Sequence, residues 1–406
     1  MGRYGAWRTG HTGMKLALAA VAAGLAGCGG GSGGGSASAP TPTPTVTPTP
    51  TTSALPYTAS IRVAFIGASI TAGTSDTSRV WANQTATWLR SQYSSATSQN
   101  FSLPYTTSQF AAYRMEEDLR GFVPDLVFVE FAVNDLLLDE NGRVRYTDAL
   151  IAKLRRANPR VIIVYVAATN ALDGSSRLAN TVPAHIRQLR DVATRNQVHF
   201  IDAGAVMWDR VRSGGGSILS YLPDGIHPND AGSDIYFAAV RDSLISYLPT
   251  AAVGPATTSY IAQTRLDGAA ILPATRAAAT GCSITNQTAA NSYWRFAQSL
   301  TCQGGNQFTL DFTGTSVGFV YGAGRDTGAL SCSIDGGPAQ TITLFDPEFP
   351  ASGLFLYANL LTGFSDGAHR VSCSVSNTRP TVNGVTSTGT SVVISGFMTS
   401  SERPIP

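Results

Sequence analysis

One stretch decides the fold class: Ile61-Arg62-Val63-Ala64-Phe65-Ile66-Gly67-Ala68-Ser69-Ile70-Thr71. Its first six residues are nearly all apolar, which predicts a strand buried on both faces. The strand is expected to end at Gly67, and Ser69 stands just before an expected helix start. Strands of this kind belong to parallel sheets that helices cover on both sides.

The same rhythm continues to about Leu248. Further apolar runs predict strands at Asp125–Phe131, Val161–Val166 and Val198–Asp202. Helical patterns predict helices at Val80–Tyr93, Tyr146–Ala157, Val182–Asn196 and Asp230–Tyr247. Strands that alternate with helices predict an α/β domain with a parallel sheet, in which ligands bind beyond the carboxyl ends of the strands.

The pattern changes after Pro255. Short segments of strand composition recur at Gln307–Phe312, Ser316–Tyr321, Ala329–Ile334, Gln340–Phe345, His369–Val375 and Ser391–Phe397. Turn signals such as Asp335-Gly336-Gly337 separate them. This spacing predicts an all-β sandwich as a second domain.

The N-terminus has the features of an export signal. Met14-Lys15 is followed by the apolar run Leu16–Leu25 and then by Cys28. The run is too short to span a bilayer permanently. Residues 1–28 are therefore expected to be a signal peptide, and the Gly/Ser-rich and Thr/Pro-rich residues 29–56 a linker. In one interpretation this is an ordinary signal peptide, and Cys28 has no role of its own.

The other four cysteines all lie in the C-terminal part of the chain. In an exported protein an even number of cysteines predicts disulfides. Three pairings are possible, and we favour Cys282–Cys302 with Cys332–Cys373.

Charge and motifs exclude several functions. The chain has 28 Lys and Arg against 26 Asp and Glu, a net charge of +2 that predicts no nucleic-acid partner. No Cys/His cluster has the spacing of a metal site, and the glycines at 214–216 lack a phosphate-loop lysine. We therefore expect no metal and no cofactor.

Three polar segments stand at the expected carboxyl edge of the sheet. A serine nucleophile needs a base, a group that orients the base, and donors for the oxyanion. Asp224 and His227 are three residues apart on a Gly/Pro-rich loop before the last helix, so one loop can present a base and its carboxylate. Asn134 directly follows a strand and can direct its amide at an oxyanion. The alternatives are that Ser69 caps a helix, that His227 only packs, and that Asn134 makes an Asx turn.

Taken in order, Gly-x-Ser, Asn-Asp after a strand, and Asp-x-x-His before the last helix resemble the SGNH/GDSL hydrolase family over about residues 60–248. The resemblance implies a flavodoxin-like three-layer α/β/α sandwich. It also implies that Ser69 is the nucleophile, His227 the base and Asp224 its orienting carboxylate. Asn134 and the backbone N–H of Ser69 would donate to the oxyanion.

Two departures from the family pattern stand out. The usual Gly-Asp-Ser reads Gly-Ala-Ser here, with Ala68 in place of a carboxylate that is not catalytic. The family's Asn-x-x-x-Gly-Gly-Thr, which supplies a third oxyanion N–H, here ends in Pro104-Tyr105-Thr106. Proline has no N–H, so Tyr105 is left as the donor, with a bulky side chain. We expect reduced activity or a site reshaped for a different acyl group.

The resemblances also divide the chain. They imply a hydrolase domain at residues 57–250, a linker at 251–258 and a jelly-roll-like β domain at 259–406. Similar modules accompany SGNH domains in some carbohydrate esterases, so the β domain either stabilises the hydrolase or binds glycan. Residues Leu25-Ala26-Gly27-Cys28 resemble the bacterial lipobox, which implies that Cys28 carries a lipid anchor in the cell envelope, with the enzyme facing the periplasm or the outside.

Three hypotheses for function follow. The first is a serine esterase that removes short acyl groups, such as acetyl, from polysaccharide through an acyl-enzyme. The second is a lipase or thioesterase on longer chains. The third is a glycan-binding lipoprotein on a degraded hydrolase fold. The expected partners are an acylated carbohydrate or small ester and, through the anchor, a membrane.

Overall fold

The computed structural model describes residues 60–74, 77–214, 216–248, 264–286, 297–349 and 354–404. The expected signal peptide, the lipid attachment at Cys28 and both linkers lie outside these residues and stay predictions. Among the helices of these segments, none combines the length and the apolar character needed to cross a membrane.

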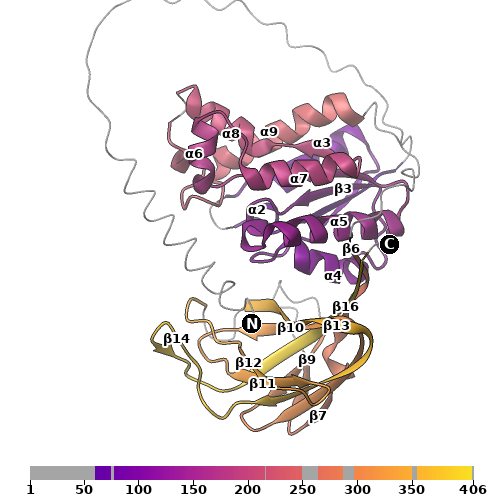
Figure 1. Cartoon of the computed structure of the whole chain (residues 1–406). Helices are drawn as coiled ribbons and strands as arrows, with labels where there is room; N and C mark the ends of the chain where they lie inside the picture. Colours follow the sequence, from indigo (N-terminus) through magenta and orange to yellow (C-terminus); the bar gives the residue numbers. More distant parts are fainter. Residues whose placement is uncertain are drawn as a thin grey trace, which may run out of the picture.

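The first domain is built on a five-stranded parallel sheet in the order β2-β1-β3-β4-β5. Its strands are β1 (Arg62–Gly67), β2 (Thr97–Asn100), β3 (Leu126–Glu130), β4 (Ile162–Val166) and β5 (His199–Ile201). All four pairings between neighbouring strands are parallel. The expected α/β fold is therefore confirmed (Figure 1).

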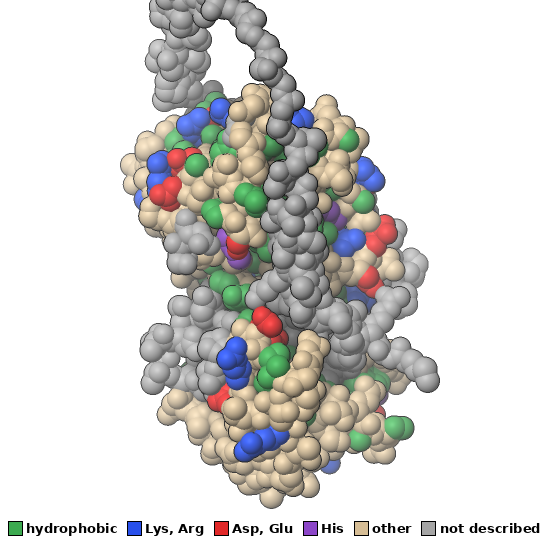
Figure 2. Space-filling view, turned by 90° about the vertical axis from the view of Figure 1, so that its left-hand side faces the viewer, with side chains coloured by type: hydrophobic (Ala, Val, Ile, Leu, Met, Phe, Trp, Pro, Cys, Tyr) green, Lys and Arg blue, Asp and Glu red, His purple; other side chains and the backbone are tan. Residues whose placement is uncertain are grey.

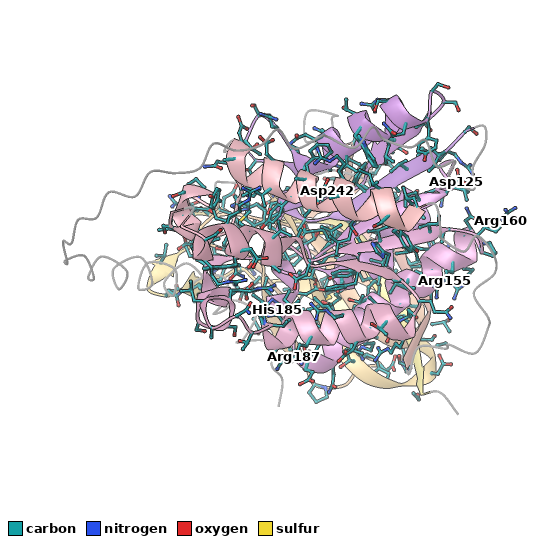
Figure 3. All side chains as sticks on the ribbon, turned by 90° about the horizontal axis from the view of Figure 1, so that it is seen from above. Asp125, Arg155, Arg160, His185, Arg187 and Asp242 are labelled. Atoms are coloured by element: carbon teal, nitrogen blue, oxygen red, sulfur yellow. A yellow bond between two sulfur atoms is a disulfide. The ribbon has the colours of Figure 1, made fainter. Side chains whose placement is uncertain are left out.

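Helices cover both faces of this sheet. Those on one face are α3 (Trp81–Gln92), α8 (Ala203–Arg212) and α9 (Asp230–Tyr247). Those on the other are α4 (Ser108–Asp118), α5 (Glu140–Ala157) and α7 (Ala184–Arg195). Seen from above, Asp242 on α9 and Arg187 on α7 lie on opposite sides of the sheet (Figure 3). Each face buries its own apolar core against the strands. Short helical segments complete the domain: α2 (Ser69–Ala72), η1 (Asn134–Leu137), η2 (Ala171–Asp173), α6 (Gly174–Leu178) and η3 (Ile218–Ser220).

Some expected boundaries are confirmed and others are wrong. Helix α9 has the predicted bounds, and Asn229 caps it by accepting a hydrogen bond from Gly232. Helix α5 begins at Glu140 rather than at Tyr146, because the side chain of Asp139 caps a polar first turn. The sequence patterns missed β2, α4 and α8 altogether.

The second domain is antiparallel, and its largest sheet has nine strands. Seven of them follow the order β12-β11-β13-β10-β16-β9-β8, while β6 pairs with β16 and β7 with β10 outside this order. Its strands are β6 (Thr264–Pro273), β7 (Ala278–Thr280), β8 (Ser283–Asn286), β9 (Gln298–Cys302), β10 (Gln307–Ala323), β11 (Ala329–Ile334), β12 (Gln340–Thr343), β13 (Leu354–Val375) and β16 (Val392–Pro404). A two-stranded hairpin, β14 (Thr381–Val382) with β15 (Val385–Thr386), and the short helix η5 (Ala274–Arg276) are added to it. The expected all-β second domain is confirmed (Figure 1).

Two of its expected strands are in fact one. Residues 307–312 and 316–321 both belong to β10, whose pairing with β13 shifts register between Gly314 and Ser316. Gly314 has a φ of 141°, and a Cβ there would lie 2.4 Å from the carbonyl oxygen of Ser400. Gly314, which separates the two expected strands in the sequence, therefore marks a bulge inside a continuous strand.

Both disulfides of the favoured pairing are present. Cys282 is bonded to Cys302, and Cys332 to Cys373. Cys332 and Cys373 are direct cross-strand partners on β11 and β13. The two bonds tie segments that lie 20 and 41 residues apart in the chain.

The two domains share a buried interface in which β6 and β16 contact α4 and α5 (Figure 1). The hydroxyl of Tyr113 on α4 is 2.8 Å from that of Ser400 on β16. The Lys153 ammonium on α5 is buried and donates to the backbone oxygen of Ala269 on β6. One apolar cluster draws on both domains: Leu103, Phe110, Ala112, Tyr113, Leu138, Tyr146 and Ala149 with Leu266, Ala269, Val320 and Met398.

Candidate active site

The turn between β1 and α2 carries Ser69. Gly67 ends β1, and a Cβ at this position would lie 2.6 Å from the hydroxyl of Thr71 and 2.8 Å from the Glu130 carbonyl. Only glycine therefore lets the chain turn this tightly. Ser69 is the first residue of α2, so its backbone N–H points out of the helix N-terminus and has no carbonyl of its own helix to bond.

Asp224 and His227 lie on one loop before α9. The Asp224 carboxylate accepts the backbone N–H groups of Ile226 and His227, at 2.8 and 2.7 Å, through one oxygen. Its other oxygen is 2.6 Å from Nδ1 of His227. Gly225 has a φ of 82°, which lets the loop close on itself in this way.

A continuous hydrogen-bond chain joins the three residues. Nε2 of His227 is 2.8 Å from Oγ of Ser69, although 158 residues separate them in sequence. Asp224, bonded to Nδ1, fixes the ring with Nε2 toward the serine. Ser69 and His227 are both partly exposed, so a substrate can reach them.

The electrostatics keep Asp224 ionised. Burial would raise its pKa, but the bonds from the His227 ring and from the N–H groups of His227 and Ile226 outweigh burial and lower the pKa to about 2. The carboxylate is thus charged at any pH at which an esterase is assayed. This charge stabilises a proton on the imidazole.

The structure places Asn134 and Tyr105 at the same edge of the sheet. Asn134 is the first residue of η1, four residues after the end of β3. The chain that follows β2 stays bonded to the end of β1, since Leu103 donates its N–H to the Gly67 carbonyl. Tyr105 therefore follows close behind the residues that flank the nucleophile turn.

Tyr105 has an unusual backbone conformation. Its φ is 65°, in the left-handed region where glycine is favoured and a bulky residue is strained. Its ring packs edge-on against Phe349 of the β domain, with 5.5 Å between ring centroids. A β-domain side chain therefore supports the residue that stands where the SGNH/GDSL pattern has glycine.

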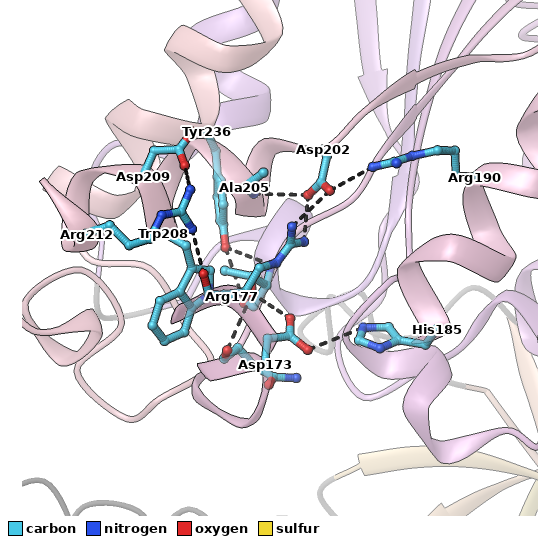
Figure 4. A network of polar contacts seen from close by, with 12 residues as sticks. Asp173, Arg177, His185, Arg190, Asp202, Ala205, Trp208, Asp209, Arg212 and Tyr236 are labelled. Atoms are coloured by element: carbon cyan, nitrogen blue, oxygen red, sulfur yellow. Dashed lines mark hydrogen bonds and ion pairs between the residues drawn. The ribbon is translucent and has the colours of Figure 1, made fainter. Parts of the chain in front are cut away.

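A buried polar network holds the loop after β4 (Figure 4). This loop contacts the Asp224–His227 loop through a 2.8 Å bond from the Ala171 N–H to the Gly225 carbonyl. The Thr169 hydroxyl donates to Asp173 and accepts from the indole of Trp208, at 2.6 and 2.9 Å. The Tyr236 hydroxyl on α9 bonds the backbone of Thr169. The network therefore stabilises the loop after β4 and, through it, the Asp224–His227 loop.

Asp202 and His185 belong to the same network. Asp202 caps α8 and is paired with Arg177 and Arg190 at 2.7 and 3.1 Å. His185 is 3.7 Å from Asp173, and burial lowers the pKa of its ring. Both residues have the structural roles that their places in a strand end and a helix indicate.

On the face shown in Figure 2, acidic and basic side chains are scattered in small groups among polar and apolar ones. Within the described residues, no group of three or more His, Cys, Asp and Glu side chains is arranged to hold a metal ion. The chemistry available to the three linked residues is proton transfer and nucleophilic attack.

Two contacts near the site were not foreseen from the sequence. Glu130 ends β3 fully buried and accepts a 2.9 Å hydrogen bond from the Thr71 hydroxyl. Phe349 reaches Tyr105 from the other domain. The signal for Glu130 was available, because a parallel central strand is buried along its whole length, including a charged last residue.

Comparisons with known proteins found one family and several solved structures that resemble this chain. Residues 65–235 match the GDSL-like Lipase/Acylhydrolase family. No curated protein matches the chain.

Two solved structures resemble both domains together. One is a two-domain esterase (CEX) active on acetylated mannans, with a TM-score of 0.70 and 19% identity, covering 85% of this chain and 92% of that one. The other is the same kind of esterase co-crystallized with mannopentaose, with a TM-score of 0.67 and 19% identity, covering 86% and 92%. At this identity the likeness establishes the shared fold.

Proposed function

We propose that this chain, whose residues 65–235 form an ester-hydrolysing domain of the GDSL-like lipase/acylhydrolase family, removes acetyl groups from polysaccharide by a Ser-His-Asp mechanism. The observation that carries the proposal is the unbroken chain from Asp224 through His227 to Ser69. Ser69 and the Asp224–His227 loop come from distant parts of the sequence and have no structural need to meet in this order.

The proposed reaction has two halves. His227 takes the proton of the Ser69 hydroxyl through Nε2 while the serine oxygen attacks the ester carbonyl carbon. The tetrahedral intermediate collapses to an acyl-enzyme, and His227 gives the proton to the leaving sugar hydroxyl. Water then attacks the acyl group with His227 again as base, and Ser69 is restored. Asp224 stays ionised throughout and stabilises the imidazolium.

The proposed oxyanion donors are the backbone N–H of Ser69, the side-chain amide of Asn134 and the backbone N–H of Tyr105. Support comes from their common position at the carboxyl edge of β1 and β3. Such donors stabilise the charge that develops on the carbonyl oxygen in the transition state.

Replacing Asn134 by alanine is expected to lower kcat by about 10²–10³-fold with little change in KM, since the lost bond forms fully only in the transition state. The measurement is steady-state hydrolysis of p-nitrophenyl acetate. Asn158→Ala is the matched control. Asn158 donates to the Pro124 carbonyl, which lies just before the amino-terminal end of β3, at the opposite edge of the sheet from Asn134. If kcat falls by the same small factor in both variants, Asn134 is not an oxyanion donor.

The acetylated-polysaccharide part of the proposal has separate support. The solved structures that share both domains are esterases active on acetylated mannans. The contact of Phe349 with Tyr105 brings the β domain next to the proposed site. A small acyl group also suits a site in which a tyrosine replaces glycine.

The test is a comparison of substrates with the full mature chain. Hydrolysis of p-nitrophenyl acetate is expected to exceed that of p-nitrophenyl octanoate, and acetate is expected to be released from acetylated mannan. Faster octanoate hydrolysis would favour the lipase or thioesterase alternative. Polysaccharide binding without hydrolysis of any ester would favour the non-catalytic one.

A further inference from the structure

The nucleophile turn rests on a buried carboxyl group that the proposed reaction does not use. The backbone of Glu130 pairs with that of Gly67, two residues before Ser69. Its Oε2 accepts a 2.9 Å hydrogen bond from Thr71, the third residue of α2. The carboxyl therefore joins the end of β3 to the helical turn that begins at the nucleophile.

The surroundings of this carboxyl favour its neutral form. Glu130 and Thr71 are both fully buried, and Oε1 of Glu130 has no hydrogen-bond partner among the described residues. No Lys or Arg in the described segments forms an ion pair with Glu130, and an unpaired buried carboxylate is costly. Burial is the main reason that the pKa of Glu130 rises to about 8. The bonds from the Thr71 hydroxyl and from the backbone of Ala68 oppose this rise, and the charge of Asp135 adds to it.

Other titratable groups face the same region. Asp135, just beyond β3, is fully buried, and burial raises its pKa to about 7, against the bond from Ser108 and the charge of Arg143 on α5. Tyr165 on β4 is buried, and burial together with both carboxyls raises its pKa well above the usual value. Oδ2 of Asp135 has no hydrogen-bond partner in the described residues. Tyr236 on α9 also responds to Glu130, but burial is the main reason its pKa rises. Two cations act in this set: Arg143 on Asp135, and Arg177 on Tyr236.

We propose that Glu130 is a positioning residue for Ser69 and that it works as a neutral acid. The proposal rests on the serine-esterase function proposed above. The protonated carboxyl bonds Thr71 and fixes the turn that presents the serine oxygen and N–H. Ionised, it would place a buried negative charge under the turn whose N–H must stabilise a developing oxyanion, and the two like charges would repel in a low dielectric.

The variant Glu130→Gln separates this role from simple packing, because the amide keeps the shape and the acceptor for Thr71 but has no proton to lose. The kcat of the parent for p-nitrophenyl acetate is expected to fall about 10-fold or more between about pH 7 and pH 9.5, since the acid ionises through about pH 8. In Glu130→Gln the kcat is expected to stay within about threefold over the same range. Rates are corrected with Ser69→Ala as the blank at each pH.

A second pair of variants tests the hydrogen bond itself. Thr71→Val keeps the volume and removes the hydroxyl, and is expected to lower kcat and the rate of labelling by a fluorophosphonate probe about 10-fold, with KM unchanged. Thr85→Val is the matched control, because Thr85 is also fully buried but bonds the Trp81 carbonyl within α3. The control is expected to lower the melting temperature without changing kcat.

The possible outcomes are distinct. Equal alkaline losses in the parent and in Glu130→Gln would overturn the inference, as would equal labelling rates in Thr71→Val and the parent. A parent no faster than Ser69→Ala at every pH would overturn the proposed function, and this inference with it.

Discussion

Replacing Ser69 by alanine is expected to lower kcat for p-nitrophenyl acetate by at least about 10⁴-fold. The alanine variant has no oxygen to attack the ester, so no acyl-enzyme forms and only the slow reaction promoted by the remaining donors persists. Initial rates of the purified variant and its parent measure the effect. Labelling by a fluorophosphonate probe, which requires the serine oxygen, is expected to disappear as well.

The matched control for this experiment is Ser91→Ala. Ser91 is an exposed serine whose hydroxyl bonds the Trp88 carbonyl on α3. It is expected to keep the parent's rate. A Ser69→Ala protein that retains more than about 1% of the parent's activity would show that another group is the nucleophile.

Replacing His227 by glutamine is expected to lower kcat by about 10⁴–10⁶-fold. Glutamine can still donate to Asp224, but its amide cannot accept the Ser69 proton, so the serine stays a weak nucleophile. Steady-state kinetics at neutral pH give the loss.

A loss of activity in mildly acidic solution is not expected to come from Asp224. Its pKa is lowered to about 2, so it stays charged down to strongly acidic solution, and its share of the folding free energy is lost only as the pH falls through about 2. His199→Gln serves as the control: its ring bonds Ser243 and stacks on Tyr247. If this control loses as much activity as His227→Gln, unfolding rather than loss of a base explains both.

The periodic parts of the fold were predictable from sequence. Strands β1, β3 and β4 are almost wholly apolar and buried, and α9 has its cap directly before it, so their existence and most boundaries followed from pattern alone. β2, with the sequence Thr97-Ser98-Gln99-Asn100, was not predictable in this way. Its residues are all exposed, and only its pairing to β1 at the sheet edge makes it a strand.

The candidate site shows the same division. Ser69, Asp224 and His227 each stand in a segment with a recognisable local pattern, so the sequence indicated them and the fold supplied the distances. The burial of Glu130 could be inferred from its place in a central parallel strand. Its role could not, because that role depends on a hydrogen bond from Thr71, which lies 59 residues away in the sequence. The contact of Tyr105 with Phe349 joins residues 244 positions apart and depends on how two domains meet.

The apolar cluster shared by the two domains has a consequence for how the chain can be rearranged in evolution or by engineering. Phe110 and Tyr113 of the first domain pack in one buried apolar cluster with Val320 and Met398 of the second. Cutting the chain near residue 250 would therefore expose an apolar surface on both fragments. Calorimetry is accordingly expected to record one cooperative melting event for the whole chain. The β domain is therefore not expected to be removable as an independent module. A gene fusion that replaces it must also redesign the surfaces of α4 and α5 that it covers.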